Sequence, residues 1–397
     1  MRISTNLLHT QGLTAMQRQQ SQLAQTQNQL SSNQKWFSAS DDPVGFGAAQ
    51  GLDRQLAQIA RYQSSADAAN HRLSVEEGAL AEGIDVLQRV RELTLQANSA
   101  GQSAQSRAAI GVELEALREQ MLGIANRDDG QGRYIFAGSA DGSAPFSWTG
   151  SAASYSGDQQ VRNAQIGATR MIAEGDAGDA VFLNLRSGNG TFAISAATTN
   201  SGASQLTASK VVDAQSWDGG SYSITFGSGS YQVLDSGSNV VQSGSYSAGS
   251  AIRFRGVEVS FSGTPASGDS YNLAPSQSQD VLALIDKLAG MMGSPQDSAA
   301  QRGQWQTELQ QGLTELDAAQ AHFSDLRAGV GVRLNAAEQA STQLGAQELS
   351  AQEALSDLRD LDYAEAATRL QMQLTALQAA QQTYTRVQGL SLFDYLR

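Results

Sequence analysis

Apolar residues recur at every seventh position near both ends of the chain, with polar residues between them. Near the start, one line consists of Met16, Leu23, Leu30 and Phe37. After Pro43, a second line consists of Leu52, Ile59, Ala66, Leu73, Leu80 and Leu87. A spacing of seven keeps one side of a helix against a partner helix when the two wrap around each other. The pattern therefore predicts long paired helices, one of them from about residue 47 to 98.

The last part of the chain carries the same spacing. One line consists of Leu309, Leu316, Phe323, Val330, Ala337, Leu344 and Ala351. Another consists of Tyr363, Leu370, Leu377 and Tyr384, with Leu374 beside it. A shorter helical pattern runs through Ile110, Leu114, Leu117, Met121 and Ile124. We therefore expect helices from both termini to pair as a rod.

The positions between these lines are unusually polar. In the first helix they are Leu13, Gln20 and Gln27, and in the longer helix they are Leu56, Gln63, Asn70, Glu77 and Ile84. A strong coiled coil carries Leu or Ile at such positions, and polar residues there reduce stability while specifying register and partner. Two interpretations stay open. Either the register is displaced by one and these residues face water, or the seam is weak until further helices complete it.

The middle of the chain differs from both ends in amino-acid composition. Residues from about 141 to 277 hold about half of the 39 glycines, with many Ser, Thr and Tyr residues. Polar and apolar residues alternate over 221–226, 230–234 and 252–261, which is typical of half-buried strands between glycine turns. Low complexity is the alternative for 236–250. We predict an α+β fold: a long helical coiled-coil rod built from both termini, with an inserted antiparallel β domain that is a small sandwich or barrel.

These differences in composition predict that the chain is divided into three parts. Residues 1–40 with 361–397 form a terminal coiled-coil assembly segment, residues 41–140 with 278–360 form a helical rod domain, and residues 141–277 form an outer β domain. Ser40, Asp41, Asp42 and Pro43 are predicted to be a helix break. Proline cannot continue a helix from inside, and Ser or Asp before it can cap the helix that follows.

Composition argues against several classes of function. A net charge of −13 without a basic stripe disfavours nucleic acid, and the apolar runs are too short for membrane insertion. The chain has no cysteine, and His9, His71 and His322 lie on separate stretches without a second ligand nearby. We predict no catalytic residue, no cofactor-binding residue, no metal site and no cofactor, and we expect that the chain is not an enzyme.

Three weaker signals have ordinary explanations. The pair Asp41-Asp42 could bind a cation but is more typical of a helix cap. The run 175–179 suggests calcium, yet it lacks the further oxygen ligands of a calcium loop and is more typical of a hairpin turn. Asn189-Gly190-Thr191 matches a glycosylation sequon, a pattern that occurs often by chance.

Two segments near the ends are more specific. The first is Leu30-Ser31-Ser32-Asn33 followed by the run 38–45, and the second is the run 360–366 followed by the closing run 390–397. They resemble the segments that join the terminal helices to the rod helices in the bacterial flagellin superfamily. The resemblance implies a self-assembling structural protein in which terminal helices from all subunits pack together.

A third passage narrows the resemblance. Gly132-Arg133-Tyr134-Ile135-Phe136-Ala137-Gly138, followed by Pro145-Phe146, is similar to the hook–filament junction family of this superfamily. The resemblance implies a homo-oligomeric ring in the extracellular flagellum, with hook-associated protein 1 on one side and flagellin on the other. It also implies unfolded export through the flagellar export apparatus, with an export chaperone as a further partner, and we expect no cleavable signal.

The heptad lines and the closing run single out residues for assembly: Met16, Leu23, Leu30, Phe37, Tyr363, Leu370, Leu374, Leu377, Tyr384, Leu392, Phe393 and Leu396. The nearest alternative function is a flagellin-type filament subunit, which shares the helical arms. A more distant alternative is a carbohydrate-binding protein or enzyme with its site in the β insertion. Trp148 and Trp217 lie there, but neither has an acidic pair at an evident spacing.

Overall fold

The computed structural model describes residues 5–99 and 101–389. The chain divides into two compact units, one made of residues up to 64 and from 341 onward, the other of residues 65–340. The two longest helices, α2 (Pro43–Ala97) and α5 (Ala299–Arg359), contribute to both units. The residue boundaries that the sequence predicts for the three parts of the chain remain a prediction.

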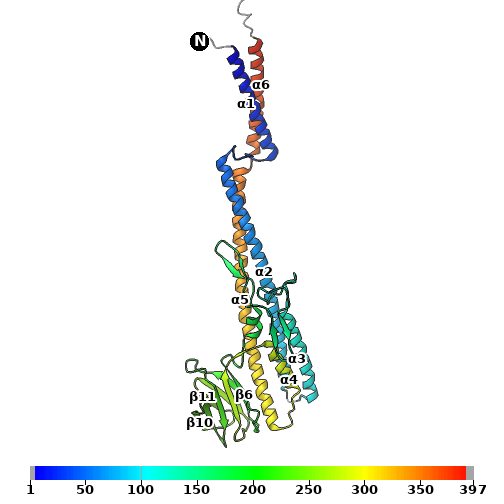
Figure 1. The fold of residues 1–397 in the computed structure, drawn as a ribbon, viewed down its shortest axis with the longest axis vertical. Helices are drawn as coiled ribbons and strands as arrows, with labels where there is room; N and C mark the ends of the chain where they lie inside the picture. Colours follow the sequence, from blue (N-terminus) through cyan, green and yellow to red (C-terminus); the bar gives the residue numbers. More distant parts are fainter. Residues whose placement is uncertain (1–4, 100, 390–397) are drawn as a thin grey trace, which may run out of the picture. The chain divides into compact units, whose positions relative to one another are not determined.

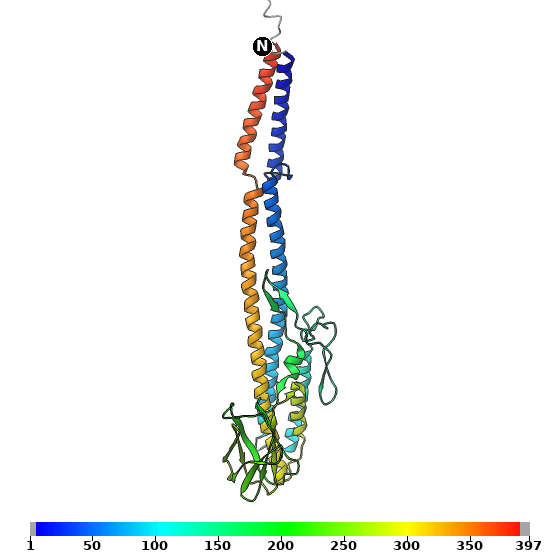
Figure 2. The same ribbon diagram turned by 60° about the vertical axis from the view of Figure 1, so that its left-hand side comes forward.

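In the first unit, α1 (Thr5–Ser32) lies beside α6 (Tyr363–Gly389), as two views show (Figures 1 and 2). The residues of α1 that are buried or half-buried are Gly12, Met16, Gln19, Leu23, Thr26, Gln29 and Leu30. The residues expected between the apolar positions are exposed instead: Leu13, Gln20 and Gln27. Met16, Leu23 and Leu30 therefore lie in the seam, and only the interleaved line is wrong on α1, by one residue. Gly12 belongs to the seam because a Cβ there would lie only 3.2 Å from the Tyr384 ring.

On α2 the first predicted line is correct, but the second is displaced by one residue, because the buried interleaved residues are Ala69, Glu76, Gly83 and Val90. Its buried line contains Ile59, Ala66, Leu73, Leu80 and Leu87. Its second line is half-buried: Leu56, Gln63, Asn70, Glu77 and Ile84. Polar members of that line have partners on α5, since the Gln63 amide donates to Glu348 at 2.8 Å and Glu77 pairs with Arg327 at 2.5 Å. These polar residues therefore flank the buried seam instead of occupying it.

The second unit adds two helices, α3 (Ala104–Ala125) and α4 (Val281–Met292), to α2 and α5. They form one apolar core, and the expected line on α5 is buried in it from Leu309 to Val330. Small residues permit the closest approaches. A Cβ on Gly83 would lie 2.7 Å from the Phe323 ring, and one on Gly111 would lie 3.1 Å from the Ala289 carbonyl oxygen.

Three pairs of short strands lie in the region between α3 and α4. They are β1 (Phe146–Trp148) with β2 (Ala153–Tyr155), β3 (Asn163–Gln165) with β4 (Met171–Ala173), and β5 (Leu185–Arg186) with β14 (Ser278–Gln279). A π-helical turn, Asp179–Leu183, precedes β5. The inner face of the β3–β4 hairpin packs on α2 and α5 through Ala164 and Ile166.

Two facing antiparallel sheets make up the rest of the β insertion. The strands are β6 (Phe192–Ala196), β7 (Gln205–Val211), β8 (Tyr222–Phe226), β9 (Ser230–Asp235), β10 (Val240–Ser245), β11 (Ala251–Phe254), β12 (Val257–Ser262) and β13 (Ser270–Pro275). Their orders are β10-β9-β8-β13-β6 and β11-β12-β7, around one shared aromatic and aliphatic core. The expected sandwich is confirmed, and 236–250 is ordered.

One expected strand is wrong. The run 252–261 is a hairpin of β11 and β12, turning at Arg255 and Gly256 with φ of 43° and 78°. The apolar positions change parity at the turn, from Ile252 and Phe254 to Val257 and Val259. That change of parity is the signal of the turn, because alternation within one strand keeps a single parity.

The sandwich docks on α5 within the second unit (Figure 1). Thr307 is fully buried, and its hydroxyl donates to the Gly303 carbonyl while accepting the Leu206 N–H of β7 at 3.1 Å. Gly303 is needed there, since a Cβ would lie 2.8 Å from the Ser204 carbonyl oxygen. An N–H of edge strand β7 is thereby satisfied by a helix hydroxyl instead of another strand.

Candidate assembly site

The paired terminal helices, α1 and α6, are the first candidate site. Their predicted assembly residues in the seam are all half-buried: Met16, Leu23, Leu30, Leu370, Leu374, Leu377 and Tyr384. Among the described side chains of 10–32 and 363–386, only Thr26, Gln29 and Ala366 are buried. Leu392, Phe393 and Leu396 lie outside the described residues. No large apolar side chain is therefore buried in this part of the described pair, and its seam is incomplete.

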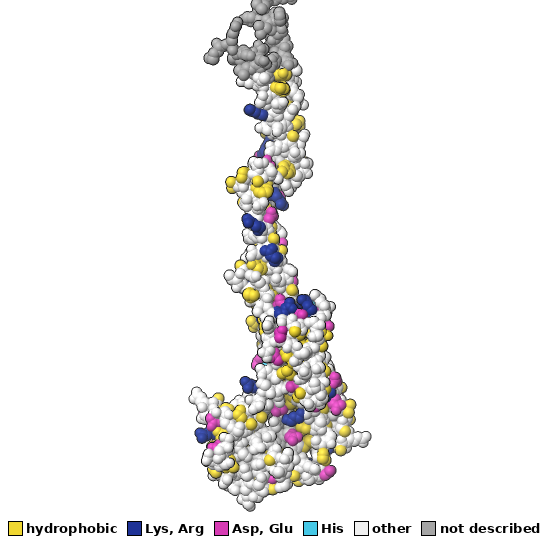
Figure 3. Space-filling view, viewed as in Figure 1, with side chains coloured by type: hydrophobic (Ala, Val, Ile, Leu, Met, Phe, Trp, Pro, Cys, Tyr) yellow, Lys and Arg dark blue, Asp and Glu magenta, His cyan; other side chains and the backbone are white. Residues whose placement is uncertain are grey.

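The surface of this pair is nearly uncharged. Figure 3 shows mostly polar, uncharged side chains over α1 and α6, with hydrophobic ones scattered among them. Within Thr5–Ser32, Arg18 is the only residue that is Asp, Glu, Lys or Arg. Exposed large apolar side chains include Leu13 and Met372. Such a surface offers apolar and amide contacts to further helices without desolvating charges.

The predicted helix break lies where α1 ends and α2 begins. Asp42 is the N-cap of α2, since its Oδ1 accepts the backbone N–H groups of Val44 at 3.1 Å and Gly45 at 2.9 Å. Pro43 is the first residue of α2, where a missing N–H costs nothing. The prediction that this motif caps the following helix is confirmed for Asp42. Helix α1, however, ends at Ser32, well before the proline.

Asp41 and Ser40 have other roles in this loop. Asp41 Oδ2 accepts the backbone N–H groups of Phe37 at 3.0 Å and Ser38 at 3.1 Å, and these two bonds hold the pKa of Asp41 below its usual value. Ser40 shares a hydroxyl contact of 2.6 Å with Ser38 and does not cap α2. Asp41 therefore shapes the turn, while Asp42 starts the helix.

A second break, between α5 and α6, lies directly beside the first. Asp362 caps α6 by accepting the N–H groups of Ala364 and Glu365 at 3.0 and 3.1 Å. Gln34 and Asp360 form an antiparallel β-bridge across the two breaks. We call residues 33–42 and 359–362 together the elbow. The two helical arms, α1–α2 and α5–α6, are therefore interrupted side by side at the elbow.

Two predicted assembly residues lie at the elbow instead of in the seam. Phe37 is in the loop after α1 and is 47% exposed, because the helix that was expected to carry it has ended. Tyr363 is the first residue of α6 and is 64% exposed. Trp36 is buried beside them, and the heptad pattern did not single it out. The sequence could have indicated Trp36 only through its position, a few residues before the predicted helix break Ser40-Asp41-Asp42-Pro43.

The Gly-x-Tyr-x-Phe-x-Gly passage builds the aromatic core of the second unit. Phe136 stacks edge-to-face on Phe182, whose ring also meets Phe146 and Phe323. The Phe136 carbonyl accepts the Gly178 N–H at 2.9 Å and the Tyr155 hydroxyl at 3.0 Å. Burial raises the pKa of Tyr155 to about 12, so it remains a donor. The passage is therefore a folding element.

Gly138, which closes that passage, can only be glycine. Its φ is +70°, and a Cβ would overlap the side chain and carbonyl of Asp158. Asp158 in turn accepts the N–H groups of Ser139 at 2.9 Å and Gln160 at 3.0 Å. Hydrogen bonds from Ser139 and Gln160 lower the pKa of Asp158. Asp158, the last residue of the segment 155–158, thus occupies the space in which a side chain of residue 138 would lie.

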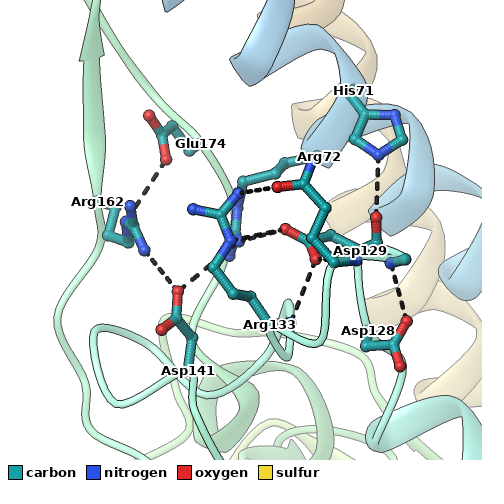
Figure 4. A network of polar contacts seen from close by, with 10 residues as sticks. His71, Arg72, Asp128, Asp129, Arg133, Asp141, Arg162 and Glu174 are labelled. Carbon is teal, nitrogen blue, oxygen red and sulfur yellow. Dashed lines mark hydrogen bonds and ion pairs between the residues drawn. The ribbon is translucent and has the colours of Figure 1, made fainter.

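A network of ion pairs holds the same loops on α2 (Figure 4). Arg72 is buried and lies 3.6 Å from Asp129 and 4.0 Å from Asp141, which also pairs with Arg162 at 2.5 Å. Burial lowers the pKa of Arg72, and the positive charge of Arg162 adds to this. Arg162 also lies 3.6 Å from Glu174. The cations and carboxylates alternate, which suits a structural clamp.

Asp129 is the best-bound carboxylate of this network. It accepts the N–H groups of Gln131 at 3.0 Å and Arg133 at 3.2 Å, and the Arg133 side chain at 3.1 Å. Desolvation alone would raise the pKa of Asp129, but these bonds and Arg72 lower it overall. His71 contacts the Asp129 carbonyl oxygen at 3.1 Å. Within residues 5–99 and 101–389, no three His, Asp or Glu side chains group to hold a metal.

The remaining sequence signals have structural roles. Asp176, in the run considered for calcium, pairs with Arg333 at 2.5 Å, and the run leads into the π-helical turn, not into a hairpin. Asn189 of the sequon accepts the N–H groups of Thr191 and Phe192 at 3.1 and 3.0 Å. No helix in the described part of the chain has the length and apolar character of a membrane span.

Comparisons with known protein families follow this division of the chain. Residues 3–141 match the bacterial flagellin N-terminal helical region, and residues 313–396 match the bacterial flagellin C-terminal helical region. Residues 195–275, within the β sandwich, match the D2-like domain of flagellar hook-associated protein 1. The flagellin matches are thus confined to the two ends.

Individual relatives cover far more of the chain. Flagellar hook-associated protein 3 of Escherichia coli (strain K12) is 25% identical over 394 residues, 99% of each chain. A crystal structure of Xanthomonas campestris FlgL is 34% identical, with a TM-score of 0.70 over 75% of this chain and 99% of that one. A structure of hook-associated protein 3 from Legionella pneumophila is 29% identical, with a TM-score of 0.75 over 78% and 98%.

Proposed function

Because the chain belongs to the flagellar hook-associated protein 3 (FlgL) family, and is thus a structural component of the flagellar junction, we propose that it assembles into a ring of identical subunits through α1 and α6. The ring lies between hook-associated protein 1 and the first layer of flagellin. The subunit reaches this place through the flagellar export apparatus, with an export chaperone on the way. Its role is structural, as it is for the relatives, and not enzymatic.

The incomplete seam of α1 and α6 is the observation that carries the proposal. A pair of helices of this length must offset the entropy of ordering its residues, and half-buried side chains recover only part of their transfer free energy. Helices from neighbouring subunits would cover Met16, Leu23, Leu370 and Leu377 from the open side. Assembly and the ordering of the terminal segments are then one process.

The two alternatives fit less well. A filament subunit of the flagellin type accounts for the two ends, but similarity to flagellin is distant, and 195–275 matches a hook-associated protein. A carbohydrate site would need exposed aromatic platforms. Trp148 lies under the Arg118 guanidinium at 4.5 Å, and Trp217 stacks with Phe192 and Tyr222. Both tryptophans thus take part in internal packing.

Complementation of a strain that lacks this chain tests the proposal. We expect Leu23→Asp to abolish swimming and to release flagellin into the medium from bare hooks. A charge there would be desolvated when neighbouring helices pack on the seam. Gln20→Asp is the matched control, since Gln20 is on the same helix but is exposed, and it should swim. Normal filaments with Leu23→Asp would contradict assembly through this seam.

A further inference from the structure

The elbow is the best-anchored part of the first unit. Across the two breaks, Leu361 donates its N–H to the Asn33 carbonyl at 3.1 Å, and Lys35 donates to the Arg359 carbonyl at 2.8 Å. The Lys35 ammonium also reaches the Asp357 carbonyl at 2.5 Å. Asn33 adopts a positive φ of 60°, which turns the chain out of α1. Backbone groups freed at the ends of both helices are therefore satisfied by each other.

Trp36 is the centre of this joint. It is 9% exposed and packs with Ala49 of α2 and Leu355 of α5, with partly buried Phe46, Leu52 and Leu56 around it. The Trp36 and Phe46 rings meet edge-to-face, 5.5 Å apart. By contrast, the described side chains of α1 and α6 contribute no residue to any apolar core cluster. The elbow therefore has a core, and the pair of terminal helices that leaves it does not.

Gly45 shows how closely the cap and the indole share this space. A Cβ at Gly45 would overlap the Asp42 carboxylate and lie 3.4 Å from Trp36 Nε1. The first turn of α2, its cap and Trp36 thus form one packed unit. The chain from α1 also enters this unit, because the Gln29 amide donates to the Lys35 carbonyl at 2.5 Å.

We propose that Trp36 is a positioning residue, which fixes the end of α1 and the start of α6 on the start of α2 and the end of α5 before neighbouring subunits arrive. The terminal helices then order from the elbow outward as the ring grows. This outward ordering rests on the proposed assembly through α1 and α6, whereas the docking of Trp36 does not. Tryptophan suits this role because one rigid side chain touches both long helices and buries a large apolar area.

Fluorine NMR on the full chain labelled with 5-fluorotryptophan tests this directly. The chain has four tryptophans, Trp36, Trp148, Trp217 and Trp305, so Trp36→Phe assigns the Trp36 signal. In dilute protein we expect that signal to be shielded from solvent, while backbone amides along α1 and α6 exchange at least tenfold faster than those at 33–35 and 359–361. A solvent-exposed Trp36 signal in the dilute chain would overturn the proposal.

Complementation then tests whether positioning matters for assembly. We expect Trp36→Ala to reduce the number of filaments per cell at least tenfold and Trp36→Phe to restore more than half of them. Unchanged Trp217 and Trp305 signals in Trp36→Ala would show that the second unit is folded. A normal filament count with Trp36→Ala would overturn the proposal. Slow exchange along α1 and α6 in dilute protein would instead contradict coupled assembly and leave the docking of Trp36 standing.

Discussion

The same seven-residue repeat gives two different outcomes in this chain. Between α2 and α5 in the second unit, it buries Leu73, Leu80 and Leu87 completely, because α3, α4 and the loops after α3 add further layers around them. Between α1 and α6 the repeat leaves its leucines half-buried. The number of elements packed around a seam, and not the repeat itself, decides whether the seam becomes a core.

The largest expected contrast compares one leucine from each region. Leu80→Ala should lower the free energy of unfolding by about 3–5 kcal/mol, because it leaves a cavity in a dense core. Leu23→Ala should lower it by less than about 1 kcal/mol in dilute protein, since the side chain is already half in water. Urea unfolding followed by the fluorine NMR signal of Trp305 for Leu80→Ala, and by that of Trp36 for Leu23→Ala, measures the loss in the unit that carries each substitution. Equal losses would contradict the distinction between a finished core and an open seam.

A buried acid in the second unit makes its stability depend on pH. Burial, with the nearby charge of Asp176, raises the pKa of Glu76 to about 8, while Arg333 and the Asp176 N–H oppose the shift. The folded state thus favours the neutral acid, so this contribution is complete below about pH 4.5 and is lost as pH rises to about 8. Within that window the free energy of unfolding should fall by roughly 1.4 kcal/mol per pH unit from this group.

Glu76→Gln should remove that slope, because the amide keeps the acceptor for the Asp176 N–H and does not ionise. Thermal unfolding of both proteins from pH 5 to pH 9 gives the comparison. Identical slopes would show that Glu76 is ionised throughout. Glu77→Gln, one residue along α2 and half-exposed, is the matched control and should keep the wild-type slope.

The smallest expected effect concerns the elbow. Asp42→Ala should destabilise the start of α2 by about 1 kcal/mol, because two N–H groups lose their acceptor. Ser40→Ala should change the stability by less than about 0.5 kcal/mol, since Ser40 contacts only Ser38 among the hydrogen bonds described for it. Hydrogen exchange at Val44 and Gly45 reports the cap directly. Equal exchange in both variants would assign the cap to another group.

Much of the fold follows from periodicity because long helices repeat the same signal many times. The lines from Leu52 to Leu87 and from Leu309 to Ala351 therefore identified α2 and α5 and their facing sides. The β sandwich followed from alternation, although the parity change between Phe254 and Val257 was read as one strand. Helix α4 was not distinguished, although its apolar residues recur at helical spacing with Lys287 and Gly290 on the exposed side, because twelve residues are too short for a line of positions seven apart.

The assembly site was harder to predict from the sequence. On α1 the leucine at position 13 suggested the wrong interleaved line, whereas the seam uses Gly12, where a small residue accommodates Tyr384. Trp36 has no repeat to mark it, since its partners Ala49 and Leu355 come from helices that are far apart in sequence. Contacts between distant segments depend on where each helical arm is interrupted. The sequence pattern indicated both interruptions but did not predict that they contact each other.

The near absence of charge on the terminal helices has a consequence for the habitats in which such a junction can work. Dissolved salt weakens contacts between exposed charges and strengthens apolar ones, and the seam residues of α1 and α6 are glutamines, threonine, glycine, alanines and apolar side chains. A junction assembled through α1 and α6, as proposed, would lose little to screening when a cell passes from dilute fresh water to brine, since the Asp, Glu, Lys and Arg residues of these helices are Arg18, Glu365, Arg369 and Arg386. Its cohesion depends on water being excluded, a condition that both environments satisfy.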